Sequence, residues 1–211
     1  MMSCTVKCLM LPMVLLFVWR LQEVAQACSC IREHPQMSFC QADVVIKATV
    51  LARKDVGGFD KPRMYTIKQD KMFKGPNRDF DVICTAASSA ACGVNLNNGV
   101  QYLLSGRLAP DGSLHVGLCN FFAPWDSLST CEKTNFIYRY RKGCDCKITP
   151  CYAVPCRITT PAECLWTDFL TNTGEMEQTR HSACLKRSDG SCAWFKENAS
   201  PKQGVKDSQR G

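Results

Sequence analysis

Cysteine content constrains this chain more than any other feature, because 16 of its 211 residues are cysteines. Such a density is typical of proteins that fold in an oxidising compartment and use disulfides to reinforce a small core. Cys4 and Cys8 lie in an N-terminal segment that we expect to be removed, which leaves 14 cysteines in 184 residues. The sequence therefore predicts a disulfide-built protein, although spacing alone does not choose the pairing.

The first 27 residues have the character of a cleaved secretory signal. Lys7 precedes an apolar stretch from Leu9 to Trp19, which is about half of the ~20 residues that a membrane span needs. The small residues Ala25 and Ala27 then offer a cleavage site. We expect a signal peptide over residues 1–27, a mature chain that begins at Cys28, and a secreted, extracellular protein without a membrane span.

The formal net charge of +7 becomes +6 once Lys7, Arg20 and Glu23 are removed. This mild basicity allows contact with acidic glycans of the extracellular matrix and gives no indication of nucleic-acid binding. A glycan-binding face and an ordinary solvated surface are both open as interpretations. The basic residues concerned are Lys68, Lys71, Lys74, Arg78, Arg139, Arg141 and Lys142.

Five segments between residues 43 and 119 combine strand-forming residues with turn residues at their ends. They are Asp43 to Val50, Met64 to Phe73, Asp79 to Thr85, Val100 to Gly106 and Ser113 to Cys119. Short strands at this spacing predict a small closed barrel. A helix is expected after Asp126, which is placed to cap it, with a stop at Gly143.

Beyond Cys144 the strand alternation is weak, and six cysteines fall in the last 67 residues. We expect a second domain from Asp145 to Gly211 that consists of loops held by disulfides, with a polar and disordered tail from Glu197. Asn198 begins an Asn-Ala-Ser glycosylation acceptor. The cysteines from Cys144 to Cys156 also resemble a zinc site, but an oxidising compartment favours disulfides.

No pattern in the sequence indicates a catalytic apparatus. The histidines are not paired at metal-ligand spacing, and neither an H-E-x-x-H motif nor a nucleophile elbow is present. We expect structural or solvent-facing roles for His34, His115 and His181, and packing roles for the tryptophans Trp125, Trp166 and Trp194. The sequence therefore predicts that the chain is not an enzyme.

A free terminus at Cys28 has chemistry of its own. A neutral amine nitrogen and the carbonyl oxygen of the same residue form a five-membered chelate with a metal ion, and the zinc of a protease keeps one coordination position open. An α-amino group with a pKa of about 7.8 needs only about 0.5 kcal/mol to lose its proton at pH 7.4, whereas a lysine needs about 4 kcal/mol. The alternative is that Cys28 and Cys30 are only disulfide anchors.

Longer sequence motifs help to decide whether Cys28 is a metal chelator or only a disulfide anchor. In the first part of the mature chain they are Cys28-Ser-Cys30, His34-Pro-Gln36, Phe39-Cys40, Ala42-Asp-Val-Val-Ile-Lys47, Lys71-Met-Phe-Lys-Gly75, Leu118-Cys-Asn120 and Pro124-Trp-Asp126. In the second part they are Gly143-Cys-Asp-Cys-Lys-Ile-Thr149, Glu163-Cys-Leu-Trp166 and Lys186-Arg-Ser-Asp-Gly-Ser-Cys-Ala-Trp194. With this ordered set the chain resembles the tissue inhibitors of metalloproteinases over nearly all of the mature sequence, and the second-type members most of all.

The resemblance implies an OB-fold five-stranded barrel of the netrin-like kind, with flanking helices, over residues 28–144, and a small disulfide-rich domain over residues 145–211. It implies inhibition of matrix metalloproteinases, in which Cys28 chelates the zinc of the target and the protein carries no cofactor of its own. Ser29 would enter the specificity pocket beside the metal. The protease-binding residues implied are Cys28, Ser29, Cys30, Ile31, Arg32, Ser88, Ser89, Ala90, Ala91, Cys92 and Gly93.

The resemblance also implies six disulfides. They join Cys28 to Cys92, Cys30 to Cys119, Cys40 to Cys144, Cys146 to Cys192, Cys151 to Cys156 and Cys164 to Cys184. Cys84 and Cys131 lie outside this pattern, and we favour an additional bridge between them over two buried thiols. The rival function is that of a netrin-type matrix-binding or receptor-ligand module that inhibits nothing.

Overall fold

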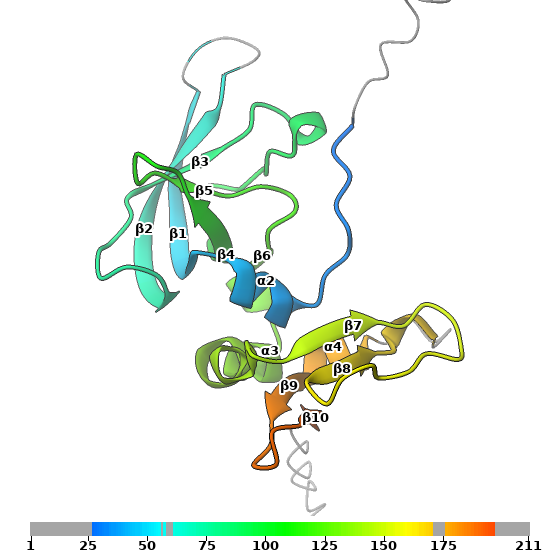
Figure 1. The fold of residues 1–211 in the computed structure, drawn as a ribbon. Coiled ribbons are helices and arrows are strands. Elements are labelled where there is room, and N and C mark those ends of the chain that lie inside the picture. Colours follow the sequence, from blue (N-terminus) through cyan, green and yellow to red (C-terminus); the bar gives the residue numbers. More distant parts are fainter. Residues whose placement is uncertain (1–26, 56, 58–60, 171–175, 197–211) are drawn as a thin grey trace, which may run out of the picture.

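The computed structural model describes residues 27–55, 57, 61–170 and 176–196 (Figure 1). The predictions of a signal peptide, of glycosylation at Asn198 and of a disordered tail fall on residues outside these ranges. A barrel forms the upper part of the molecule in Figure 1, and a flatter C-terminal region lies below it. Among the described residues, no helix is both long and apolar enough to cross a membrane.

The barrel contains the five expected strands. They are β1 (Val44–Asp55), β2 (Arg63–Lys74), β3 (Val82–Thr85), β4 (Gln101–Leu108) and β5 (Leu114–His115). Their order is β1-β2-β3-β5-β4, and β4 pairs back onto β1, so the sheet is closed. Only β3 and β5 run parallel, and a short strand β6 (Phe122–Pro124) extends the sheet beside β4. The predicted mainly β fold with a closed five-stranded barrel is therefore confirmed.

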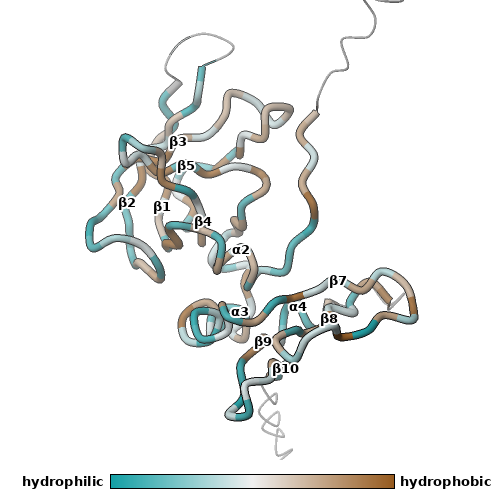
Figure 2. Tube along the Cα trace, in the orientation of Figure 1, coloured by the Kyte–Doolittle hydropathy of each residue, from teal (hydrophilic) through white to brown (hydrophobic). Residues whose placement is uncertain are grey.

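Strand β1 shows why the sequence folds in this way. Val44, Ile46, Ala48 and Val50 alternate into the barrel core and are fully buried. Val45 lies on the other face of the strand, where it packs in a second apolar cluster below the barrel. Because β1 is covered on both faces at its start, it has no polar position there. Figure 2 shows the hydrophobic stretches on the strands and the hydrophilic turn that follows β2.

The expected helix before Gly143 exists, but it begins later than predicted. It consists of α3 (Thr130–Thr134), a π-helical turn η3 (Asn135–Arg139) and a 3₁₀ turn η4 (Tyr140–Gly143). Ser129 caps it through a reciprocal pair of hydrogen bonds with Glu132, which is the capping-box arrangement. Asp126 lies instead in the separate 3₁₀ turn η2 (Trp125–Ser127), since the extended backbone at Leu128 interrupts the helix.

The C-terminal region contains two small sheets rather than loops alone. Parallel strands β7 (Lys147–Pro150) and β8 (Glu163–Trp166) form one, and antiparallel strands β9 (Ser182–Lys186) and β10 (Cys192–Lys196) form the other. A 3₁₀ turn η5 (Asp168–Leu170) and the helix α4 (Glu177–His181) lie between β8 and β9. Strand alternation is weak in this part of the sequence because each of these strands is only four or five residues long.

One buried carboxylate organises β7, β8 and their connection. The side chain of Glu163 is 2% exposed and accepts hydrogen bonds from Lys147 Nζ at 2.9 Å and from the backbone nitrogen and hydroxyl of Thr159 at 2.7 and 2.8 Å. These bonds, those from Thr159 foremost, lower the pKa of Glu163 to about 2. The region thus depends on a satisfied polar group in its interior.

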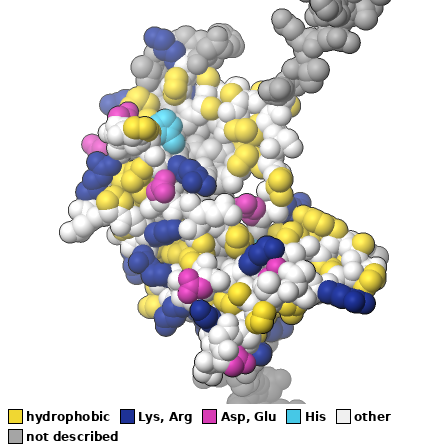
Figure 3. All heavy atoms as spheres, in the orientation of Figure 1, with side chains coloured by type: hydrophobic (Ala, Val, Ile, Leu, Met, Phe, Trp, Pro, Cys, Tyr) yellow, Lys and Arg dark blue, Asp and Glu magenta, His cyan; other side chains and the backbone are white. Residues whose placement is uncertain are grey.

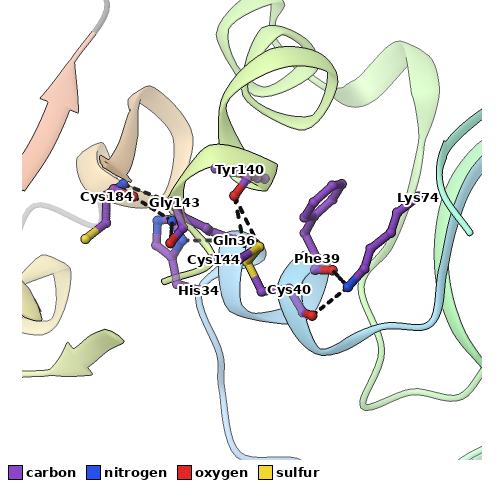
Figure 4. Close-up of a disulfide and its surroundings, with 9 residues drawn as sticks. All are labelled: His34, Gln36, Phe39, Cys40, Lys74, Tyr140, Gly143, Cys144 and Cys184. Carbon is purple, nitrogen blue, oxygen red and sulfur yellow. Dashed lines mark hydrogen bonds between the residues drawn. A yellow bond between two sulfur atoms is a disulfide. The ribbon is translucent and has the colours of Figure 1, made fainter. Parts of the chain in front are cut away.

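The helix α2 (Pro35–Gln41) connects the barrel to the C-terminal region. The side-chain amide of Gln36 donates to the carbonyls of Gly143 and Cys184 at 3.0 and 2.7 Å and accepts from the Cys184 nitrogen at 2.8 Å (Figure 4). His34 caps α2 because its Nδ1 accepts from the Gln36 nitrogen, so the hydrogen on Nε2 points to the Gln178 carbonyl at 3.2 Å. Burial lowers the pKa of His34 to about 4. We call His34 and Gln36 with these partners the joint.

Candidate functional site

The segment from Cys28 to Arg32 runs beside the barrel as an extended chain without helix or strand (Figure 1). Ser29, Cys30 and Arg32 are exposed, and Ile31 is 84% exposed. Val154 is 78% exposed and Ile158 is 56% exposed, so Ile31 is one of several accessible apolar side chains among the described residues. We call Cys28 to Arg32 the terminal segment.

Two disulfides attach the terminal segment to the barrel. Cys28 is bonded to Cys92 and Cys30 to Cys119, and the sulfurs of Cys28 and Cys30 lie 3.8 Å apart. The backbone nitrogen of Cys28 also donates a hydrogen bond to the Ala90 carbonyl at 2.9 Å. The position of Cys28 is therefore fixed by covalent and hydrogen-bonded contacts at the same point.

The loop from Ser88 to Gly93 lies directly against Cys28. It forms a 3₁₀ turn η1 (Ser89–Ala91), in which the Ser88 hydroxyl accepts from the Ala91 nitrogen at 3.2 Å. Cys92 has the left-handed backbone conformation with φ of 65°. A side chain at Gly93 would collide with the backbone carbonyl of Ala86. The predicted loop is thus a tight and exposed turn that presents Ser88 to Ala91 next to the terminal segment.

Two supporting residues were not predicted from the sequence: Arg63 beside this loop, and Asn120 in the turn that carries Cys119. Arg63 is buried although it is charged, and it donates to the Ala87 carbonyl at 2.7 Å and to the side chain of Asn95. Asn120 accepts from the Gly117 nitrogen at 2.8 Å and so shapes the turn that carries Cys119. A signal for Arg63 was present, because it occupies the inward phase of β2 together with Tyr65 and Ile67.

The six disulfides form the pairs that the resemblance implied. The additional bridge is a wrong prediction, since Cys84 and Cys131 keep their thiols. Cys84 lies in β3 between β2 and β5, whereas Cys131 lies in α3, and its sulfur contacts the His181 carbonyl at 3.5 Å. A disulfide requires Cα atoms within about 7 Å, and these residues have different neighbours. Burial first, and the charge of Asp111 second, raise the pKa of the Cys84 thiol.

The sulfurs at the terminal segment are close enough to suggest a metal centre, but they are not available as ligands. Those of Cys28, Cys30, Cys92 and Cys119 lie within 4.8 Å of one another, and so do those of Cys146, Cys184 and Cys192. Every one of them is bonded in a disulfide, and zinc binds the thiolate. These sulfurs therefore cannot bind a metal as thiolates while the disulfides are intact.

These features first define a class: a disulfide-locked barrel with an exposed, covalently held segment beside an exposed loop. Comparison with known sequences then identifies the family. Residues 26–194 match the family described as tissue inhibitor of metalloproteinase. The chain is 47% identical over 216 aligned positions to metalloproteinase inhibitor 2 of Cavia porcellus and 46% identical to that of Homo sapiens, in each case over 98% of both sequences.

The metalloproteinase inhibitor 2 of Gallus gallus is 45% identical over 193 aligned positions, which cover 87% of this chain and 88% of the relative. The chain therefore belongs to the tissue inhibitor of metalloproteinase family. This membership places it among protease inhibitors rather than enzymes.

Proposed function

We propose that this protein inhibits matrix metalloproteinases and that Cys28 chelates the catalytic zinc of the target through its α-amino nitrogen and carbonyl oxygen. The names of the relatives support inhibition of metalloproteinases. The observation that carries the chelation mechanism is the fixed position of Cys28, which is bonded to Cys92 and hydrogen-bonded to Ala90 at the exposed end of the barrel. Cleavage after Ala27 would convert its amide nitrogen into the amine that a metal can bind.

The hydrogen bond to Ala90 is compatible with metal binding. A neutral amine has two hydrogens and one lone pair, so one hydrogen can stay on the Ala90 carbonyl while the lone pair faces the metal. The disulfide removes the Cys28 thiolate as a competing ligand. Because the amine is already positioned, binding would cost little ordering entropy. An amine in the open position of the zinc displaces the water that a protease uses as its nucleophile.

The neighbouring residues would occupy the substrate cleft. In this proposal Ser29 enters the specificity pocket beside the metal, Cys30, Ile31 and Arg32 continue along the cleft, and the loop from Ser88 to Gly93 lies alongside. Ile31 is 84% exposed, so its side chain is accessible to a protease. Residues 28–144 would form the inhibitory domain, residues 145–211 would adjust the choice of partner, and the protein would act after secretion.

A protein that retains one alanine before Cys28 tests the mechanism. The added residue converts the amine into an amide, which has no lone pair available for zinc, so inhibition of an isolated metalloproteinase catalytic domain should fall by orders of magnitude. Removal of the extra alanine with an aminopeptidase is the matched control and should restore inhibition. Equal inhibition by the extended and unextended proteins, with all six disulfides intact, would exclude chelation and favour a module that binds without inhibiting.

Glycan binding is a second candidate, and one cluster favours it. Phe73 and Trp125 stack with their ring centroids 6.2 Å apart, and the ammonium groups of Lys47 and Lys133 lie 4.9 and 5.1 Å from the Trp125 ring. Lys71 lies 5.5 Å from the Phe73 ring. Against this, Lys and Arg side chains on the face shown in Figure 3 are interspersed with Asp and Glu. Retention on immobilised heparin, compared between the wild type and Lys47→Gln with Lys133→Gln, tests this function separately.

A further inference from the structure

Three side chains with sulfur or nitrogen donor atoms lie side by side on the outer face of the barrel, on adjacent strands. Met64 of β2 pairs with Cys84 of β3, and Cys84 pairs with His115 of β5. The neighbours of these residues along each strand point into the core, and Ile83 and Leu114 are examples. Because side chains alternate along a strand, Met64, Cys84 and His115 share the outer face. None of them belongs to the terminal segment or its loop.

The same three residues line one hollow, with a volume of about 340 Å³, together with Lys61, Asp111 and Ser113. Directly paired residues of antiparallel strands, such as Met64 and Cys84, have Cβ atoms about 4.5–5.5 Å apart, and neighbouring strands of any sheet lie about 4.7–4.9 Å apart. A central residue with a partner on each side can therefore share one metal ion with both, since metal–sulfur and metal–nitrogen bonds are about 2.0–2.3 Å long. Met64 and Cys84 are half-buried and His115 is exposed, so an ion can enter from solvent.

A hydrogen-bond relay fixes the form of the His115 ring. The Ser113 hydroxyl donates its only hydrogen to Asp111 Oδ1 at 2.7 Å, so its oxygen must accept in the 2.9 Å contact with His115 Nε2. The hydrogen of the ring therefore lies on Nε2, and Nδ1 keeps its lone pair. A metal-binding histidine usually donates its other ring N–H to an acceptor such as a carboxylate, a carbonyl or a water, and the Ser113 oxygen is such an acceptor.

We propose that Met64, Cys84 and His115 form a binding site for a soft monovalent metal ion, Cu(I) in the first place. Thiolate and thioether ligands select Cu(I), and imidazole also binds copper. Binding forms a bond between copper and the Cys84 sulfur and releases the thiol proton to solvent, with no change of oxidation state. The thiolate neutralises the charge of the ion. This site is independent of the proposed inhibition.

Anaerobic titration of Cu(I) into the mature chain from Cys28 to Gly211, in competition with the chromogenic chelator bicinchoninate, tests the site. The wild type and Cys131→Ser, which removes the other thiol among the described residues, should each retain one equivalent, and Cys84→Ser should retain none. Met64→Leu and His115→Gln should each weaken binding about tenfold or more, and Ser113→Ala should also weaken it through the relay. Met72→Leu on the same strand and His181→Gln are the matched controls and should bind as the wild type does.

Ag(I), which is not reduced or oxidised under these conditions, provides a second readout that does not depend on the chelator. Its addition should shift the NMR signals of the His115 ring in the wild type and not in Cys84→Ser. Retention of one equivalent of copper by Cys84→Ser would overturn the proposal. So would wild-type affinity in both Met64→Leu and His115→Gln, because the thiol would then bind metal alone and the three residues would not form a site.

Discussion

The barrel and the C-terminal region belong to one chain but are stabilised by different interactions. The barrel has a closed strand ladder around a continuous apolar core that includes Ile46, Ile83 and Leu104. In the C-terminal region the core cluster consists largely of disulfide sulfurs around Ile148 and Trp166, and a buried carboxylate, Glu163, holds its loops. A region that is too small for an ordinary core thus relies on covalent and polar contacts.

This difference explains where the proposed inhibitory surface lies. The terminal segment is held to the barrel by Cys92 and Cys119, both of which lie in barrel loops. The C-terminal region contacts the barrel through the joint and a shared apolar cluster that contains Ala183 of β9. The rigid part of the molecule therefore supports the segment that must be pre-organised, and the predictions below test how far the two regions are independent.

The largest effect is expected from removing the bridge between Cys40 and Cys144, which links α2 to the end of η4 across a sequence separation of 104 residues. In the double variant Cys40→Ser with Cys144→Ser, the free energy of unfolding should fall by about 4.7 kcal/mol, because the unfolded chain gains the entropy of an open loop. Urea unfolding followed by fluorescence measures this change. Cys131→Ser is the control. A loss of less than about 2 kcal/mol would mean that the barrel and the joint hold this position without the bridge.

Trp166→Ala should lower the free energy of unfolding of the C-terminal region by about 3–5 kcal/mol, because Trp166 is 1% exposed at the centre of its core cluster. Hydrogen exchange should accelerate in β7 to β10 and stay slow in β1, β2 and β4. Trp125→Ala, at a half-buried site on the barrel, is the comparison and should cost less. Equal acceleration in both regions would show that they unfold as one unit.

Acid should loosen the joint before it affects Glu163. The folded pKa of His34 is about 4 and its ordinary value is 6.5, so the unfolded chain binds more protons as the pH falls through this interval. The free energy of unfolding should therefore decrease by about 3 kcal/mol between pH 6.5 and 4. The contribution of Glu163 is lost only below its ordinary value of 4.5, as the pH falls toward about 2.

Denaturant unfolding at a series of pH values measures this loss. His34→Asn is the matched variant, because asparagine also caps helices but does not titrate. Its stability should depend less on pH over the same interval. Superimposable pH profiles for the wild type and His34→Asn would show that His34 contributes nothing to acid sensitivity.

The smallest effect is expected from the bridge between Cys151 and Cys156, whose sequence separation is only 5 residues. Replacing both with alanine should cost about 2 kcal/mol, confined to the C-terminal region because Glu163 still holds Thr159 beside β8. Calorimetry and hydrogen exchange of β7 and β8 measure this. A loss as large as that for the Cys40 to Cys144 bridge would show that this short loop, rather than the buried carboxylate, organises the region.

Local sequence patterns explain which helices and strands could be predicted. Strand-forming residues bounded by turn residues identified all five barrel strands, because these are local features that require no knowledge of the partner strand. The seven-residue helix α2 gave no comparable signal, since it is short and is capped by His34 rather than by a usual capping residue. The helix was predicted to begin after Asp126, but its cap is Ser129. Either residue type can cap a helix, and only the extended backbone at Leu128 decides between the two.

The sequence by itself determined the disulfide-rich character, the barrel strands and the residues of the terminal segment, because these depend on composition, alternation and contiguous motifs. Only the tertiary structure decided that Cys84 and Cys131 stay unbridged, that Arg63 supports the loop beside Cys28, and that His34 and Gln36 join the two regions. The physical reason is that each of these outcomes depends on the distance and orientation of groups far apart in the chain. A thiol, a guanidinium or an amide is recognisable in a sequence, but its partner is set by the packing around it.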